Sequence, residues 1–254
     1  MTVLKTLGDF PALVIVIVFA GLMIIFAAAG RQHPGRNLRE IHAFTRLRRA
    51  VGLAVEAGTR LHISLGRGGM IGPESGSALA GFSILERITR AASISDRPPV
   101  ATSGDSVLSI LSQDTLRGTY RAMGVEHEYK PESAQLTGLT PLSYAAGAMP
   151  VIRDGQVSAN VLAGHFGSEV ALLIEAGERA GSITIAGTDS LPGQAVLFAA
   201  AHEPLIGEEL FAGGAYLGAG ALHVASLRTL DVFRWTLIIV ILVGALARFV
   251  GIWK

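Results

Sequence analysis

Two long apolar blocks lie near the ends of the chain. The first, residues 10–30, is FPALVIVIVFAGLMIIFAAAG and contains no charged residue. About 20 apolar residues at 1.5 Å each cross a hydrocarbon core of roughly 30 Å. The second, residues 233–254, has a shorter uncharged centre, which spans the core if Arg234 and Arg248 extend toward the head groups. We predict transmembrane helices at 1–30 and 231–254.

Each block has an alternative interpretation. The first block is also compatible with a cleaved signal peptide, although its apolar run is long and no small-x-small cleavage site follows it. The second block is also compatible with a buried core helix. Arginines follow the first block and precede the second, so the positive-inside tendency predicts that the segment between them faces the cytoplasm.

Residues 31–58 form a basic stretch in which apolar residues recur at helical spacing, as Phe44, Leu47 and Val51 do. Such a helix lies on anionic lipid, or it packs on the neighbouring domain while its arginines set the topology. Both interpretations stay open from the sequence. The residues expected at a membrane surface are Arg36, Arg39, Arg46, Arg48 and Arg49.

Between residues 59 and 230, short β-prone runs alternate with amphipathic helical segments. The β-prone runs lie at 61–65, 98–104, 133–139, 157–164, 182–187 and 221–227. Helical periodicity appears at 77–92, 105–123 and 168–180. Strands separated by helices of 10 to 15 residues indicate βαβ units. We therefore predict an α/β fold: a doubly wound, mainly parallel, Rossmann-like sheet of five or six strands, inserted between the two transmembrane helices.

A glycine-rich segment, GRGGMIG, follows the first β-prone run at residues 66–72. Doubly wound sheets bind ligands at the carboxyl ends of their strands, and small polar residues follow several of the predicted strands here. The candidate ligand-binding residues are Gly66, Gly68, Gly69, Ser103, Asp105, His165, Ser168, Glu169 and Asp189.

The glycine-rich segment matches no known phosphate-binding motif closely. Its glycines do not follow the G-x-G-x-x-G spacing, and no G-K-[ST] ending is present. Tight turns need glycine whether or not a ligand binds, so we favour a turn over a phosphate cradle. His165 and Glu169 lack a third metal ligand of known spacing, the chain has no cysteine, and no G-x-S-x-G motif occurs. We predict no catalytic residue and no metal site, and the cofactor is unknown.

Composition bears on the partners. Hydrophobic residues make up 50% of the chain and charged residues only 16%, against roughly 25% in soluble domains. Alanine- and glycine-rich stretches run through the central domain. We expect part of its surface to be covered by a second copy, by the bilayer or by a larger membrane complex. With a net charge of +1, no nucleic-acid partner is expected.

Several phrases together resemble an uncharacterised bacterial membrane protein family, a domain of unknown function. They are AVEAGTRLHISLGRGGMIG, ISDRPPVATSGD, YAAGAM, ANVLAGHFGSE, LIGEELFAGGAYLG and HVASLRTLDVFRW. The resemblance spans roughly residues 50 to 250. It implies an α/β core, a C-terminal membrane helix and attachment to the bacterial inner membrane, and it transfers no catalytic residue.

Three functions follow as hypotheses. The first is a membrane-anchored structural or regulatory assembly protein, homo-oligomeric through its α/β domain and without evident catalysis. The second is a nucleotide- or anion-binding module or enzyme that uses the loop from Gly66 to Gly72. The third is an accessory subunit of a larger membrane complex.

Overall fold

The structure is a computed structural model that describes residues 2–30, 38–93 and 95–249. The chain forms two compact units, Arg39–Gly218 on the one hand and Met1–Leu38 with Ala219–Lys254 on the other. The larger unit begins about 20 residues before the domain start predicted at residue 59, because the basic helix that precedes the first strand packs into it.

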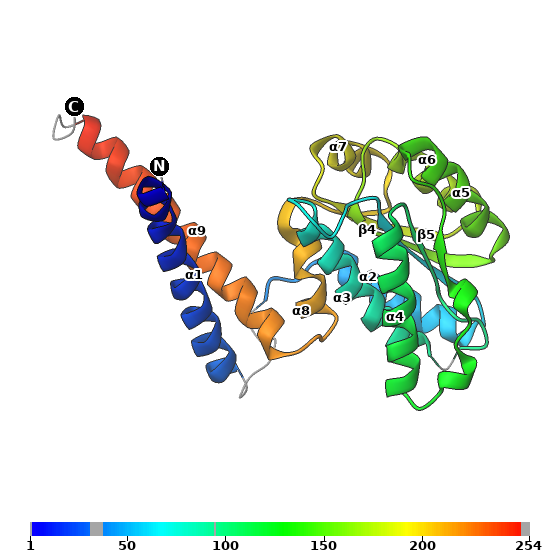
Figure 1. Cartoon of the computed structure of the whole chain (residues 1–254). Coiled ribbons are helices and arrows are strands. Elements are labelled where there is room, and N and C mark those ends of the chain that lie inside the picture. Colours follow the sequence, from blue (N-terminus) through cyan, green and yellow to red (C-terminus); the bar gives the residue numbers. More distant parts are fainter. Residues whose placement is uncertain (1, 31–37, 94, 250–254) are drawn as a thin grey trace. The chain divides into compact units, whose positions relative to one another are not determined.

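The larger unit is built on a sheet of six parallel strands. Helices pack against this sheet (Figure 1). Their order across the sheet is β3-β2-β1-β4-β5-β6. The strands are β1 (Arg60–Gly66), β2 (Val100–Ser103), β3 (Ala134–Leu136), β4 (Val157–His165), β5 (Ile183–Thr188) and β6 (Glu203–Leu205). The predicted α/β fold with a parallel sheet is confirmed, and its order is that of a doubly wound sheet.

Helices precede, connect and follow the strands. They are α2 (His42–Glu56), α3 (Ser75–Ala92), α4 (Ser106–Ala122), α5 (Pro141–Asp154), α6 (Val170–Arg179), α7 (Leu191–Ala200) and α8 (Gly213–Tyr216), with 3-10 turns η1 (Glu126–Glu128), η2 (Pro131–Ser133) and η3 (Gly207–Ala212). Helices α4 and α6 end before Gly124 and Gly181, which both have positive φ, so the predicted helix ends are confirmed.

The predicted strand at 221–227 is wrong. These residues begin a long helix, α9 (Ala221–Phe249), which continues into the second apolar block. The sixth strand is instead β6, whose short sequence contains Pro204. It pairs only with β5, at the edge of the sheet, where a residue without an N–H donor is tolerated.

The two faces of the sheet carry different helices because side chains alternate along each strand. On one face, Leu162 and Ala186 belong to a buried cluster with Tyr144 of α5 and Leu173 of α6. On the other face, α3 approaches so closely that a Cβ at Gly81 would lie 2.4 Å from the carbonyl oxygen of Ala163. The core therefore has two layers, one on each side of the sheet.

A buried polar chain crosses the centre of the sheet. His62 of β1 is fully buried, and its ring nitrogens lie 2.7 Å from Asn160 Oδ1 and 2.8 Å from Thr102 Oγ1. The Asn160 amide donates to the carbonyl of Leu173 at 3.2 Å, which fixes its oxygen toward the ring. Burial lowers the pKa of His62 to about 4, although the Asn160 hydrogen bond opposes the shift. The ring is therefore neutral at pH 7.

Helix α2 packs its apolar face against the rest of the α/β domain. Phe44, Leu47 and Val51 are buried, and the ring of Phe44 stacks on that of Tyr216 at 5.1 Å between centroids. The structure thus supports packing on the domain, one of the two interpretations left open. Among the predicted membrane-surface arginines, Arg39 pairs with Glu209, while Arg48 and Arg49 are exposed and Arg36 lies outside the described residues.

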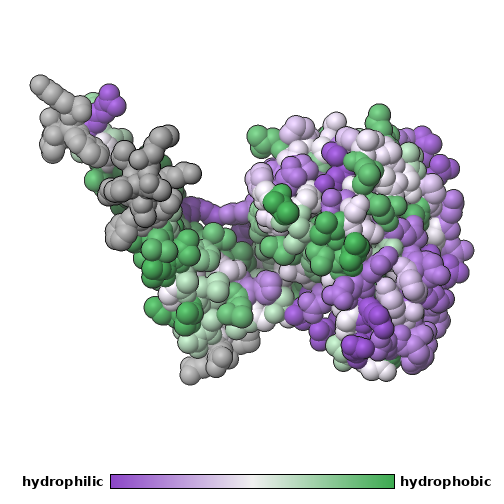
Figure 2. Space-filling model, viewed as in Figure 1, coloured by the Kyte–Doolittle hydropathy of each residue, from purple (hydrophilic) through white to green (hydrophobic). Residues whose placement is uncertain are grey.

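The smaller unit contains α1 (Thr2–Gly30) and α9. Its segments Pro11–Gly30 and Ala221–Phe249 are long and apolar enough to cross a membrane, with mean hydropathies of 3.0 and 2.1. Figure 2 shows mostly hydrophobic residues on the coloured part of this helix pair. The rings of Phe19 and Phe233 lie 5.8 Å apart, so the two helices contact each other.

Candidate functional site

The candidate site lies at the carboxyl ends of β1 and β4, where the strand order reverses. The chain leaves β1 toward α3 on one face of the sheet and leaves β4 toward α6 on the other face. In doubly wound folds this divergence opens a crevice in which ligands bind. The predicted residues at the carboxyl ends of β1, β2, β4 and β5 therefore lie at the same end of the sheet.

The glycines of the first loop allow close packing of the chain. A Cβ at Gly66, where φ is +71°, would lie 2.2 Å from the carbonyl oxygen of His165. A Cβ at Gly68 would lie 2.7 Å from the Cβ of His165 and 3.2 Å from that of Glu74. Gly69 has no such neighbour, since its nearest contact is 3.7 Å away. Two glycines thus bring the β1 loop against β4, a role that requires no ligand.

An ion pair lies across this edge. The Nε of Arg67 is 3.1 Å from Oε1 of Glu169, whose side chain is only 4% exposed. The stem of Arg67 packs over Gly104, at the end of β2, where a Cβ would lie 2.4 Å from its Cγ. Burial acts to raise the pKa of Glu169, but the N–H groups of Gly167 and of Glu169 itself, together with Arg67, outweigh it and lower the pKa. Glu169 is therefore ionised at pH 7.

His165 lies between two carboxylates. Its Nδ1 is 2.7 Å from Oδ1 of Asp189, and its Nε2 is 3.7 Å from Oε1 of Glu74. A carboxylate on Nδ1 holds an imidazole in one tautomer, as in sites where histidine acts as a general base. Among the described side chains, however, no hydroxyl hydrogen-bonds this ring, so the arrangement provides orientation without an evident nucleophile.

The remaining predicted residues have local structural roles. Asp105 caps α4, accepting hydrogen bonds from the N–H groups of Val107 and Leu108 at 2.9 and 3.0 Å. Ser103 is buried, and its hydroxyl faces the carbonyl of Asp105 at 3.5 Å. Ser168 is exposed in the turn before α6. The structure therefore brings His165, Glu169 and Asp189 close to the β1 loop, and it gives Ser103, Asp105 and Ser168 other contacts.

Two site residues escaped the sequence prediction. Glu74 precedes α3 in a glycine- and proline-rich loop, where no sequence pattern indicates which way its side chain points. Tyr144 of α5 is fully buried and its hydroxyl hydrogen-bonds Ser64 of β1 beneath the site. Burial raises the pKa of Tyr144 to about 12. The small-residue stretch around Tyr144 gave no sign that its one aromatic ring anchors α5 to the sheet.

The charges at this edge disfavour a phosphate. Three carboxylates, those of Glu74, Glu169 and Asp189, face one guanidinium and one imidazole. Glu74 also occupies the position directly before α3, where a helix N-terminus would otherwise attract an anion. Among the residues that the structure describes, no group of three histidine, aspartate or glutamate side chains could hold a metal ion.

Comparison with protein families gives a match to a domain of unknown function, DUF6754, over residues 4–254. The chain belongs to this family. The predicted resemblance to an uncharacterised family is therefore confirmed, while its bacterial origin stays a prediction. Comparisons with curated proteins and with solved structures give no match. Family membership assigns no activity to the DUF6754 domain described above.

Proposed function

We propose that this DUF6754 protein is a membrane-anchored structural or regulatory assembly protein whose α/β domains associate with one another. It lies in the bacterial inner membrane with this domain in the cytoplasm. The observation that carries the proposal is the uncharged, exposed face of α7. The three carboxylates at the carboxyl end of the sheet support an assembly role over an anion-binding one.

Helix α7, LPGQAVLFAA, has no charged residue. Only Gly193 and Leu197 are buried in it, while Leu191 is 79% and Phe198 is 77% exposed. A surface helix of a water-soluble domain normally turns charged or polar residues outward. An exposed apolar helix of this kind is typical of an interface with another protein.

The free energy gained by burying this helix is sufficient for an interface between copies anchored in one membrane. Burying the exposed part of Phe198, roughly 150 Å² for a ring of this size, contributes about 4 kcal/mol per copy before the costs of association. Helix α7 is only about 15 Å long, so it covers less than the roughly 800 Å² per partner of a stable soluble complex. Anchoring in the bilayer raises the effective concentration of the copies and compensates for the small area.

Membrane anchoring is supported by α1 and α9. Both meet the length and hydropathy of membrane-spanning helices, and the contact between Phe19 and Phe233 pairs them. A cleaved signal sequence would leave α9 without this partner. The arginine-rich stretch after α1 supports a cytoplasmic α/β domain by the positive-inside tendency.

The test is the copy number of the full chain in lipid nanodiscs, measured by mass photometry. We expect a multiple of the 26.5 kDa chain for the wild type and a shift toward single copies for Phe198→Glu. The matched control is Ile110→Glu on α4, since Ile110 is 65% exposed on the opposite side of the sheet. A single-copy wild type would favour the accessory-subunit hypothesis, and equal shifts in both variants would contradict a role for α7.

A further inference from the structure

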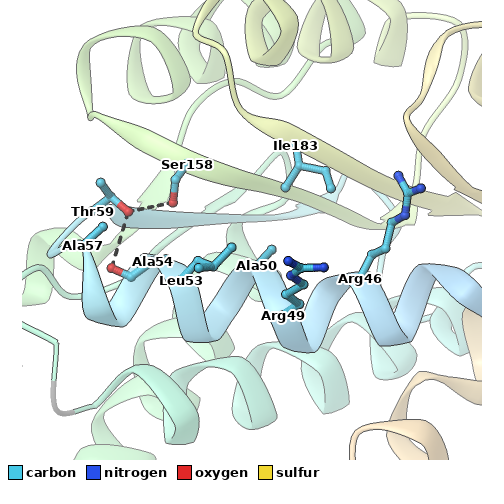
Figure 3. A pocket seen from close by; sticks show the side chains of 9 residues that line it. All are labelled: Arg46, Arg49, Ala50, Leu53, Ala54, Ala57, Thr59, Ser158 and Ile183. Atoms are coloured by element: carbon cyan, nitrogen blue, oxygen red, sulfur yellow. Dashed lines mark hydrogen bonds between the residues drawn. The ribbon is translucent and has the colours of Figure 1, made fainter.

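A second feature of the larger unit is a groove along α2, shown in Figure 3. Its volume is about 530 Å³, within the usual range for small-molecule sites. One wall is a stripe of α2 at helical spacing, and the other wall is formed where β1, β4 and β5 begin. The lining residues are Arg46, Arg49, Ala50, Leu53, Ala54, Ala57, Thr59, Ser158 and Ile183. This groove lies at the opposite end of the strands from His165 and Glu169.

The groove is long, narrow and apolar at its centre. The part of α2 from Arg46 to Ala57 that lines the groove is about 16 Å long, at 1.5 Å per residue. The volume, spread over this length, leaves a cross-section suited to one hydrocarbon chain. Ala50, Leu53 and Ile183 supply the apolar walls, and Leu53 is 55% exposed although it belongs to a helix whose opposite side is buried.

The ends of the groove differ. At one end, Thr59 Oγ1 donates to Ser158 Oγ at 2.7 Å, so these hydroxyls satisfy each other. At the other end are two guanidinium groups. Arg46 pairs with Glu203 at 2.9 Å and its side chain is 61% exposed. Arg49 has no ion-pair or hydrogen-bond partner among the described side chains, so one positive charge at the groove is uncompensated.

We propose that this groove binds a single-chain anionic amphiphile of the fatty-acid type. The hydrocarbon chain lies between α2 and the starts of β4 and β5, and the carboxylate pairs with Arg49, beside Arg46. The apolar lining removes the chain from water, and the unpaired guanidinium supplies a charge-assisted hydrogen bond for the head group. This site does not depend on the assembly role proposed above.

The test uses the full chain in phosphatidylcholine nanodiscs with a photoreactive dodecanoate. After irradiation, labelled peptides are mapped by mass spectrometry as the probe concentration is varied. We expect labelling of the peptides carrying Leu53 and Ile183, saturating with probe. Arg49→Gln weakens the apparent affinity about tenfold, because a charge-assisted contact is lost. Arg48→Gln, the same charge change on the same helix outside the groove, leaves the affinity within about twofold.

A second pair of variants tests the apolar part. Ala50→Trp fills the groove and lowers labelling about tenfold, whereas Thr45→Trp, an exposed change on α2 that does not line the groove, leaves it unchanged. The far-UV circular dichroism spectrum checks that each variant is folded. If Ala50→Trp fails to fold, the Arg49→Gln and Arg48→Gln pair still decides.

Three outcomes overturn the proposal. Labelling confined to α1 and α9 shows that the probe only enters the bilayer. Equal labelling by the uncharged photoreactive dodecanol shows that Arg49 recognises no anion. Displacement of the probe by inorganic phosphate alone shows a site for free anions and removes the need for a hydrocarbon chain.

Discussion

The buried ring of His62 predicts a specific dependence of stability on pH. Asn160 Oδ1 can only accept a hydrogen bond, so Nδ1 of the ring carries the proton and Nε2 accepts from the Thr102 hydroxyl. The neutral ring is thus fully satisfied within the sheet. Protonation places a charge in a site with no accessible solvent, and for this reason the folded-state pKa falls to about 4.

The sign of the effect follows from the two pKa values. In the unfolded chain the ring has the ordinary pKa of about 6.5, so below this pH the unfolded chain binds a proton that the folded domain does not. The free energy of unfolding is therefore largest above about pH 7 and decreases as the pH falls toward 4. The expected loss is about 2 kcal/mol by pH 5 and approaches about 3 kcal/mol near pH 4, below which it levels off.

The measurement is urea unfolding of the full chain in nanodiscs at about pH 8, 6.5 and 5, followed by far-UV circular dichroism. His62→Gln lowers stability at pH 8 but removes most of the loss between pH 8 and pH 5. His127→Gln is the matched control, because the side chain of His127 is 74% exposed and its removal leaves the pH dependence intact. Parallel pH profiles for the wild type and His62→Gln would refute the assignment of this dependence to the buried ring.

Three further predictions concern the packing of the domain, and urea midpoints at pH 7 check each of them. Gly81→Ala forces a methyl group against a β4 carbonyl and lowers the stability of the domain by about 2 kcal/mol. Gly118→Ala on α4, whose added methyl group meets no atom within 4 Å, raises it by roughly 0.5–1 kcal/mol. Equal effects of the two changes would contradict the close approach of α3. Asp105→Ala removes the cap of α4 and costs about 1 kcal/mol, and a cost near zero would mean that the cap is dispensable. Arg67→Met leaves the nearly buried carboxylate of Glu169 without its ion pair and lowers stability by about 2–3 kcal/mol. Adding Glu169→Gln to this variant should recover part of the loss. No recovery would mean that the loss comes from the packing of the aliphatic part of the arginine side chain.

Much of the fold could be predicted because it depends on local patterns. The strand around His62 and the strand around Val161 are short β-prone segments, and both are buried along nearly their whole length, as the strands of a parallel sheet are. Glycines with positive φ ended α4 and α6 where expected. These signals need only neighbours in the sequence, so one chain is sufficient to find them.

The errors arose where tertiary context decides. The segment 221–227, ALHVASL, is mostly apolar and has the length of a strand, yet it continues without a break into α9. Proline is unfavourable within a strand, because it has no N–H to donate, and the position of β6 at the edge of the sheet makes Pro204 acceptable there. Neither outcome can be derived from a window of seven residues, because each depends on what lies beside the segment in space.

The candidate site shows a further limit of sequence patterns. A glycine after the first strand is required both where a phosphate approaches the backbone and where another strand does. Here the neighbour at Gly66 and Gly68 is His165, and the distances leave no room for a Cβ at either position. A phosphate cradle also needs a helix N-terminus free of negative charge, whereas Glu74 lies directly before α3. The glycine pattern therefore predicts close backbone approach, and the charges around it decide whether the approaching group is a ligand or the protein itself.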